Sequence, residues 1–178
     1  QGQELAHALF GGADAQRQCG SGFLGLCRQQ SQQALLVFGL PGGEQAVGQG
    51  DRFEIILPLQ QGFDEYFGLP YSNDMWPRHP ERKNYFPELP LIEGDRTVAQ
   101  DPDQSQLTRQ YTERAVRFIE RHKDTPFFLY VPHTMPHVPL YGAPEHVGRS
   151  KYGRYGDIIG EIDWSVGRIV EALDKAGV

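Results

Sequence analysis

The clearest pattern of apolar and polar positions lies near the middle of the chain. In the stretch "DPDQSQLTRQYTERAVRFIERHKDTP", apolar residues recur every three or four positions, which places them on one face of an α-helix. Asp103 or Ser105 can cap the start of this helix, and Pro126 stands beyond its end. We therefore predict a helix with one buried face. The residues of that face are Leu107, Tyr111, Ala115, Phe118 and Ile119.

A strand and a second helix are predicted after the first helix. The run "FFLYV", from Phe127 to Val131, is short and continuously apolar, as in strands buried on both faces of a parallel sheet. The stretch "GDIIGEIDWSVGRIVEALDKAG" then repeats the helical period and ends at Gly177 as a C-cap. Helix, strand, loop and helix in this order indicate an α/β domain. The periodic positions of the second helix are Ile158, Ile162, Val166, Ile169, Val170 and Leu173.

The two ends of the predicted domain are less regular. Residues 1–50 are rich in Gln and Gly and offer one plausible buried strand, "ALLVFGL", from Ala34 to Leu40. We expect the rest of residues 1–50 to be atypical, poorly ordered or disrupted, and residues 51–178 to form a partial domain. Within that domain, Gly62–Asp95 is predicted to be a long excursion with turns instead of regular elements. Because a crossover helix normally leads into another strand, we expect the domain to be incomplete at its C-terminus.

Composition and charge exclude several classes of protein. The formal net charge of −6 disfavours a general role in binding nucleic acid or an anionic membrane. No apolar run is long enough to span a bilayer, and the first residues lack the pattern of a signal peptide. Cys19 and Cys27 lack CxxC spacing, so they indicate neither a disulfide framework nor a zinc site.

Two histidines are the best candidates for chemistry. His133 and His137 stand two and six residues beyond "FFLYV", and open α/β sheets bind ligands beyond the carboxyl ends of their strands. Neighbouring prolines stiffen the loop that presents them, and they preclude the helical turn that an HxxxH zinc site would need. The alternative is that both imidazoles are ordinary hydrogen-bonded or solvated loop residues.

Other polar residues offer weaker signals. Asn73 and Asp74 could bind a cation or a polar substrate, although a side-chain-stabilised turn is the simpler interpretation. Glu161 and Asp163 are two positions apart on the predicted helix, so they do not share a face. We expect them to be solvated beside a packed Trp164.

The quoted segments together resemble a known family. In their order, "GDRFEIILPLQQGFDEYFGLPYSNDMW", "PFFLYVPHTMPHVPLY" and "YGDIIGEIDWSVGRIVEAL" are similar to the middle of an arylsulfatase, in the sulfatase branch of the alkaline-phosphatase-like superfamily. The resemblance covers residues 50–178. It implies a partial sulfatase domain with a central mixed sheet flanked by helices, calcium and formylglycine as cofactors, and hydrolysis of a small-molecule, glycan or lipid sulfate ester. It also suggests an exported or lysosomal protein.

The resemblance assigns roles to individual residues. It implies that His137 is catalytic and binds the sulfate group, that His133 is a supporting substrate-binding residue, and that the segment Gly62–Asp64 shapes a loop. An imidazole suits this role because it can donate a hydrogen bond to a sulfate oxygen and change its charge near neutral pH.

The sequence also departs from the family pattern. The C/S-x-P-S-R motif that carries formylglycine is absent, since "CRQQS" at Cys27 lacks the Pro and the Arg. The segment Ala46–Gln49, "AVGQ", stands where the family has Lys-Trp-His-Leu-Gly. No residue can be assigned as a calcium ligand. We therefore expect these 178 residues to be inactive alone. The alternative function is a non-catalytic module that binds an anion through the His137 loop.

Overall fold

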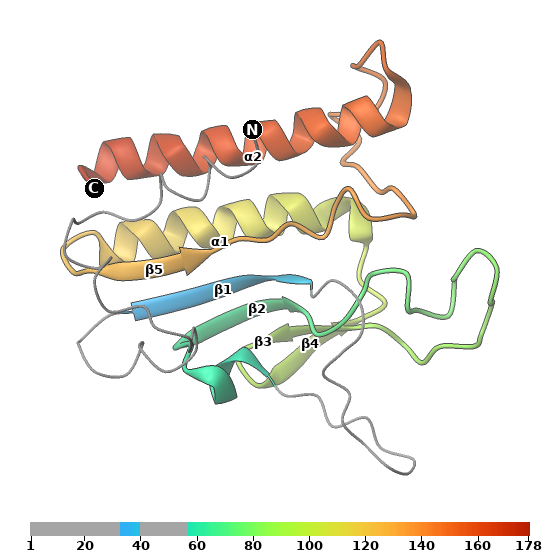
Figure 1. The fold of residues 1–178 in the computed structure, drawn as a ribbon, viewed down its shortest axis with the longest axis horizontal. Helices are drawn as coiled ribbons and strands as arrows, with labels where there is room; N and C mark the ends of the chain where they lie inside the picture. The colour runs from blue at the N-terminus through green and yellow to red at the C-terminus, as the bar shows by residue number, and fades with distance from the viewer. Residues whose placement is uncertain (1–32, 40–56) are drawn as a thin grey trace, which may run out of the picture.

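The described structure is built around one mixed β-sheet (Figure 1). The computed structural model describes residues 57–178 in full and the backbone of residues 33–39. Five strands lie in the order β4-β3-β2-β1-β5; β1, β2 and β5 are parallel, and β3 and β4 run antiparallel to their neighbours. The predicted α/β class with a central mixed sheet is confirmed. The strands are β1 (Gln33–Gly39), β2 (Glu65–Leu69), β3 (Pro90–Glu93), β4 (Arg96–Gln100) and β5 (Phe127–Tyr130).

Two long helices lie on one side of this sheet. In Figure 1, α1 (Leu107–His122) lies between the sheet and α2 (Gly153–Ala176). The prediction for α1 is confirmed, because its five periodic apolar residues are all buried. A short 3₁₀ turn, η4 (Gln104–Gln106), precedes it, and the Asp103 carboxylate caps that turn by accepting from the backbone N–H of Ser105 at 3.0 Å.

The prediction for α2 is right in its period and wrong in its buried face. Val166 and Val170, predicted to pack inward, are 41% and 47% exposed. Glu161, predicted to be solvated, is 1% exposed, whereas Trp164 is 36% exposed. The helix has apolar residues on more than one side, so its partners, and not the period alone, decide which side is buried. The buried residues are Asp157, Ile158, Glu161, Ser165, Ile169 and Ala172.

The strand β5 is parallel to β1, but it is less buried than predicted. Phe127 and Leu129 are half-buried and pack toward α1 and α2, while Tyr130 is 47% exposed. The expectation of burial on both faces is therefore wrong for the described residues. The reason is that α1 and α2 both lie on one side of the sheet, so Tyr130, on the opposite face of the strand from Phe127 and Leu129, has no described helix above it.

The excursion Gly62–Asp95 is only partly irregular. Its two ends form β2 and β3, and β3 turns into β4 at Gly94, whose φ of +63° favours glycine. Residues 70–89 between the strands contain neither helix nor strand. Gly62 has a φ of 99° and ends the 3₁₀ turn η3 (Pro58–Gln61), which agrees with a loop-shaping role.

Few predictions for residues 1–50 can be compared with the structure. The strand predicted from Ala34 to Leu40 is confirmed as β1, and its side chains lie outside the described residues. The rest of the predicted poorly ordered segment and both cysteines also lie outside them, and the domain boundary near residue 50 stays a prediction. In the described part of the chain, neither helix combines the length and the apolar character of a membrane span.

Candidate functional site

Two loops meet at the carboxyl edge of the sheet. Because β2 and β5 both run parallel to β1, the segments that follow them leave the sheet on the same side. Trp76 from the first segment and Tyr141 from the second make an edge-on ring contact, with centroids 5.7 Å apart. The Arg78 guanidinium carbon lies 5.0 Å from the centre of the Trp76 ring. The two segments therefore form one structure at the edge where open α/β sheets bind ligands.

The segment after β5, residues 131–152, is called here the histidine loop, and α2 ties it down along one helical stripe. Asp157, Glu161 and Ser165 are spaced four residues apart, so they lie above one another on the buried face. Asp157 accepts from the backbone N–H groups of Gly148 at 2.8 Å and Ser150 at 2.7 Å.

The other two residues of the stripe contact earlier parts of the loop. Glu161 accepts from the backbone N–H of Ala143 at 3.0 Å, and Ser165 Oγ lies 2.8 Å from His133 Nε2. We call Asp157, Glu161 and Ser165 the polar ladder of α2. It fixes the histidine loop to the helix at its beginning, middle and end.

The two carboxylates of the ladder have opposite pKa shifts. The backbone N–H groups of Gly148 and Ser150 hold the pKa of Asp157 below its ordinary value, because they stabilise the charged form. Burial raises the pKa of Glu161, and the single bond from Ala143 only partly opposes this. Asp157 is therefore an ionised anchor, while Glu161 has a weakened preference for its charged form.

His133 lies at the anchored side of the histidine loop. Its imidazole is half-buried, and burial lowers its pKa to about 4, because desolvation disfavours the charged ring. The next residue, Thr134, is buried with its hydroxyl oxygen 3.0 Å from the Tyr111 hydroxyl. This part of the loop is thus bonded to both helices and carries a neutral histidine at neutral pH.

His137 lies on the open side of the same loop. Its side chain is exposed, and Nδ1 lies 2.7 Å from the carbonyl oxygen of Val138. A carbonyl oxygen only accepts, so Nδ1 is the donor of this bond. Nε2 is then the ring nitrogen that can serve a ligand. The structure places both predicted histidines at the carboxyl edge but gives them separate contacts.

The weaker candidates have structural contacts. Asn73 is 1% exposed: its side-chain N–H donates to the side-chain carbonyl of Gln104 at 2.9 Å, and its backbone carbonyl accepts from the side-chain N–H of Gln104 at 2.8 Å. Asp74 accepts from the Ser72 hydroxyl at 2.6 Å, within a turn in which the Met75 N–H donates to the Ser72 carbonyl. These contacts favour the turn interpretation over a cation site.

The sequence interpretation missed Ser165 and Thr112, which lie beneath His133. The Ser165 and Thr112 hydroxyl oxygens are 2.6 Å apart and buried. A signal was present for one of them, because Asp157, Glu161 and Ser165 form a polar stripe at a spacing of four residues along the helix. No sequence signal pointed from that stripe to Thr112.

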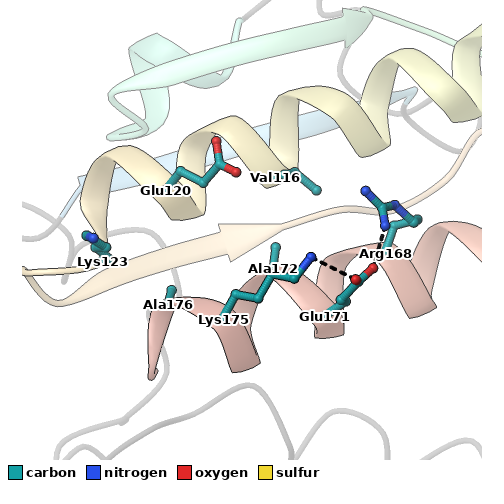
Figure 2. A pocket seen from close by; sticks show the side chains of 8 residues that line it. All are labelled: Val116, Glu120, Lys123, Arg168, Glu171, Ala172, Lys175 and Ala176. Carbon is teal, nitrogen blue, oxygen red and sulfur yellow. Dashed lines mark hydrogen bonds and ion pairs between the residues drawn. The ribbon is translucent and has the colours of Figure 1, made fainter.

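A shallow groove between the two helices lies away from this site. Figure 2 shows it between the C-terminal halves of α1 and α2, which lie at the amino ends of the parallel strands. Glu171 in its wall pairs with Arg168 and, at 2.8 Å, with Lys175. The groove carries surface ion pairs and lies at the opposite edge of the sheet from the histidine loop, so it is not part of the candidate site.

The fold and the site together define a class of protein: an α/β domain with ligand-facing loops gathered at the carboxyl edge of a mixed sheet. Residues 40–178 match the family model described as Sulfatase. The chain therefore belongs to the sulfatase family, as the sequence resemblance predicted.

Curated relatives agree with this assignment. N-acetylgalactosamine-6-sulfatase of Mus musculus is 34% identical over 135 residues, which are 68% of this chain and 25% of that protein. Steryl-sulfatase of Rattus norvegicus is 37% identical over 89 residues, 49% of this chain and 15% of that protein. This chain thus spans about a quarter or less of the length of these relatives.

A solved structure supports the fold. The sulfatase PsFucS1 from Pseudoalteromonas sp. superposes with a TM-score of 0.62 at 22% identity, covering 82% of this chain and 33% of the other. At this identity the similarity concerns the fold alone. It confirms that the described elements form part of a sulfatase-like α/β domain.

Proposed function

We propose that this chain is part of an arylsulfatase-like sulfuric ester hydrolase, in which the histidine loop forms one wall of the sulfate site. The observation that carries the proposal is the position of His137. Its imidazole is exposed at the carboxyl edge of the sheet, and the bond from Nδ1 to Val138 leaves Nε2 for a ligand. In a member of the sulfatase family, an imidazole in this place suits contact with a sulfate group.

The role proposed for His137 rests on the family resemblance, and this geometry is compatible with it. When protonated, Nε2–H can donate a charge-assisted hydrogen bond to a sulfate oxygen and then transfer its proton to the departing alcohol oxygen. His133 supports this residue from the anchored side of the loop. Positive charge beside Tyr141 of the same loop favours an anionic ester: burial raises the pKa of Tyr141, and the nearby guanidinium groups of Arg78 and Arg154 partly oppose this rise.

The family's cofactors do not fit the residues of this chain. Calcium would stabilise the charge of the sulfate group, and formylglycine would supply the nucleophile. Among residues 57–178, no three His, Cys, Asp or Glu side chains come together as a metal site, and the sequence lacks a C/S-x-P-S-R motif. We therefore propose that hydrolysis needs residues beyond these 178, and that the chain alone holds one wall of the site.

The substrate class is proposed from the relatives. The N-acetylgalactosamine-6-sulfatase of Mus musculus matches 68% of this chain, and the steryl-sulfatase of Rattus norvegicus matches 49%. The match to the first relative covers more of this chain, and it supports a sulfated sugar over a sulfated sterol. The competing proposal is a non-catalytic module that binds an anion through His137.

Binding is tested by titrating inorganic sulfate into the chain and following its histidines by NMR. We expect the His137 ring resonances to shift at millimolar sulfate. His79 is the matched control, because its Nδ1 accepts from the backbone N–H groups of Glu81 and Arg82 at 3.1 Å and its Nε2 lies 3.8 Å from the Asp74 carboxylate, so neither ring nitrogen is open to sulfate. An unchanged His137, or an equal response at His79, would overturn the proposed sulfate contact.

Catalysis is tested by transplanting residues 57–178 into the matching segment of the mouse relative. We expect the chimaera to hydrolyse a chromogenic aryl sulfate and His137→Ala to lower kcat by about 10²–10⁴-fold, the usual contribution of a general acid. Val147→Ala, an exposed change on the same loop, should leave kcat unchanged. A folded chimaera that binds sulfate but never hydrolyses the ester would favour the non-catalytic module.

A further inference from the structure

Three residues beneath His133 form a buried chain of hydrogen bonds. His133 Nε2 lies 2.8 Å from Ser165 Oγ, which lies 2.6 Å from Thr112 Oγ1. The Thr112 hydroxyl donates to the backbone carbonyl of Thr108 at 2.7 Å. Ser165 and Thr112 are 0% and 2% exposed, so the bulk solvent does not offer these hydroxyls other partners.

Counting hydrogens fixes the direction of this chain. Each hydroxyl has one hydrogen, and a carbonyl oxygen can only accept. Thr112 must use its hydrogen on the Thr108 carbonyl, because two oxygen atoms 2.7 Å apart with no hydrogen between them would repel. Thr112 Oγ1 is therefore the acceptor of the Ser165 hydroxyl hydrogen. Ser165 Oγ then has only lone pairs left for His133, so His133 Nε2 must be the donor.

We propose that His133 is a positioning residue, held with its proton on Nε2 by Ser165 and Thr112, and that it fixes the start of the histidine loop for His137. The link to His137 rests on the proposed function, whereas the position of the proton does not. The proton count also deepens that function. With hydrogen on Nε2, a neutral His133 has a lone pair on Nδ1 and cannot donate a hydrogen bond from that atom to a sulfate oxygen.

Two further observations support a positioning role. Burial lowers the pKa of His133 to about 4, so the ring is neutral at neutral pH and carries one hydrogen only. The adjacent Thr134 bonds to Tyr111 of α1, so the chain around His133 is tied to α1 and α2 together. The backbone three residues before His137 is thereby held in place, which restricts where the His137 ring can lie.

The position of the proton can be read directly in the unmodified chain. Long-range ¹H–¹⁵N spectra of ¹⁵N-histidine-labelled protein distinguish a protonated ring nitrogen from one with a lone pair. At neutral pH we expect His133 to carry its proton on Nε2. A spectrum with the proton on Nδ1 would overturn the proposal without any variant having to fold.

A matched pair of substitutions tests the cause. Thr112→Val keeps the shape but removes the acceptor, so the Ser165 hydroxyl becomes free to donate to His133 Nε2, and we expect the population to shift toward the Nδ1–H form. Thr112→Ser keeps the hydroxyl and should keep the wild-type spectrum. Identical His133 spectra in the two folded variants would show that Thr112 does not set the tautomer.

Sulfate titration of the same proteins separates this inference from the proposed function. We expect Thr112→Val to weaken the sulfate response of His137 several-fold and Thr112→Ser to leave it unchanged. If wild-type His137 ignores sulfate, the proposed function fails while the assignment of the His133 proton stands. If His137 responds equally in both variants, the sulfate contact stands and the positioning role fails.

Discussion

The two sides of the histidine loop hold the same side chain in opposite ways. On the anchored side, the half-buried ring of His133 has Nε2 directed at the Ser165 hydroxyl. On the open side, His137 is exposed, and its Nδ1 donates to the neighbouring carbonyl of Val138. One histidine is bonded to the scaffold through Nε2, and the other keeps Nε2 for a ligand. Proximity in sequence therefore says little about shared chemistry, because the partner atom and the burial decide what each imidazole can do.

The largest expected effect concerns pH. The pKa of His133 is about 4 in the folded protein and 6.5 ordinarily. Between these two pH values, His133 is protonated in the unfolded state and neutral in the folded state. Stability contributed by neutral His133 is full above pH 6.5 and is lost as pH falls toward 4. The difference corresponds to up to about 3 kcal/mol. Urea unfolding at several pH values measures it.

Comparison with His133→Gln isolates this contribution. The raised pKa of Glu161 acts in the opposite direction, because folded Glu161 binds its proton at higher pH than the unfolded chain does. The lowered pKa of Asp157 removes stability only below its ordinary value of 3.8. Glu161 and Asp157 act in the same way in both proteins, and glutamine does not titrate. His133→Gln should therefore lose less stability than the wild type between pH 6.5 and 4. Equal losses in the two proteins would show that His133 is not desolvated as described.

Replacing each histidine by alanine should show how differently His133 and His137 contribute to stability at neutral pH. We expect His133→Ala to lower the free energy of unfolding by about 2 kcal/mol, because a partly buried ring and its bond to Ser165 are lost. His137→Ala should change it by less than about 0.5 kcal/mol, as for an ordinary surface substitution. Denaturant unfolding at pH 7.5 measures both. Comparable losses would mean that the open side is also part of the scaffold.

The smallest expected effect comes from an exchange of shape-matched residues. Thr134→Val on the anchored side removes the hydroxyl that bonds to Tyr111 and should cost about 1 kcal/mol. Val138→Thr on the open side, where Val138 is 65% exposed, should be within about 0.5 kcal/mol of the wild type. Thermal unfolding of the pair checks this. A larger loss for Val138→Thr would reverse the assignment of the two sides.

Much of the secondary structure could be predicted, and the exceptions have physical causes. The face of α1 was predictable because its apolar residues form one stripe, and that stripe is buried. The face of α2 was not, since Val166 and Val170 continue its period but remain exposed. Glu161 is buried where its backbone partner, Ala143, needs an acceptor. A hydrogen bond to a distant loop has no signature in helical periodicity.

The candidate site also combines features that local sequence predicts with features that only tertiary contacts determine. The sequence placed both histidines just past β5, and its motifs pointed to the sulfatase family and to His137; the family match supports that assignment. The sulfate contact itself stays a prediction until the titration and the chimaera are measured. Nothing in the local pattern distinguished the ring environments, because Ser165 lies 32 residues from His133 and Thr112 lies 53 residues from Ser165.

By itself, the sequence determined the α/β class, the period of both helices, the family and the stretch that holds the histidines, because all of these depend on local spacing and ordered motifs. Only the tertiary structure decided which side of α2 is buried, which residues tie down the loop and which nitrogen of each histidine carries the hydrogen. These depend on atoms brought within 3 Å of one another by the packing of α1 and α2. These hydrogen bonds join residues that are far apart in the sequence, so they form only when the chain has folded.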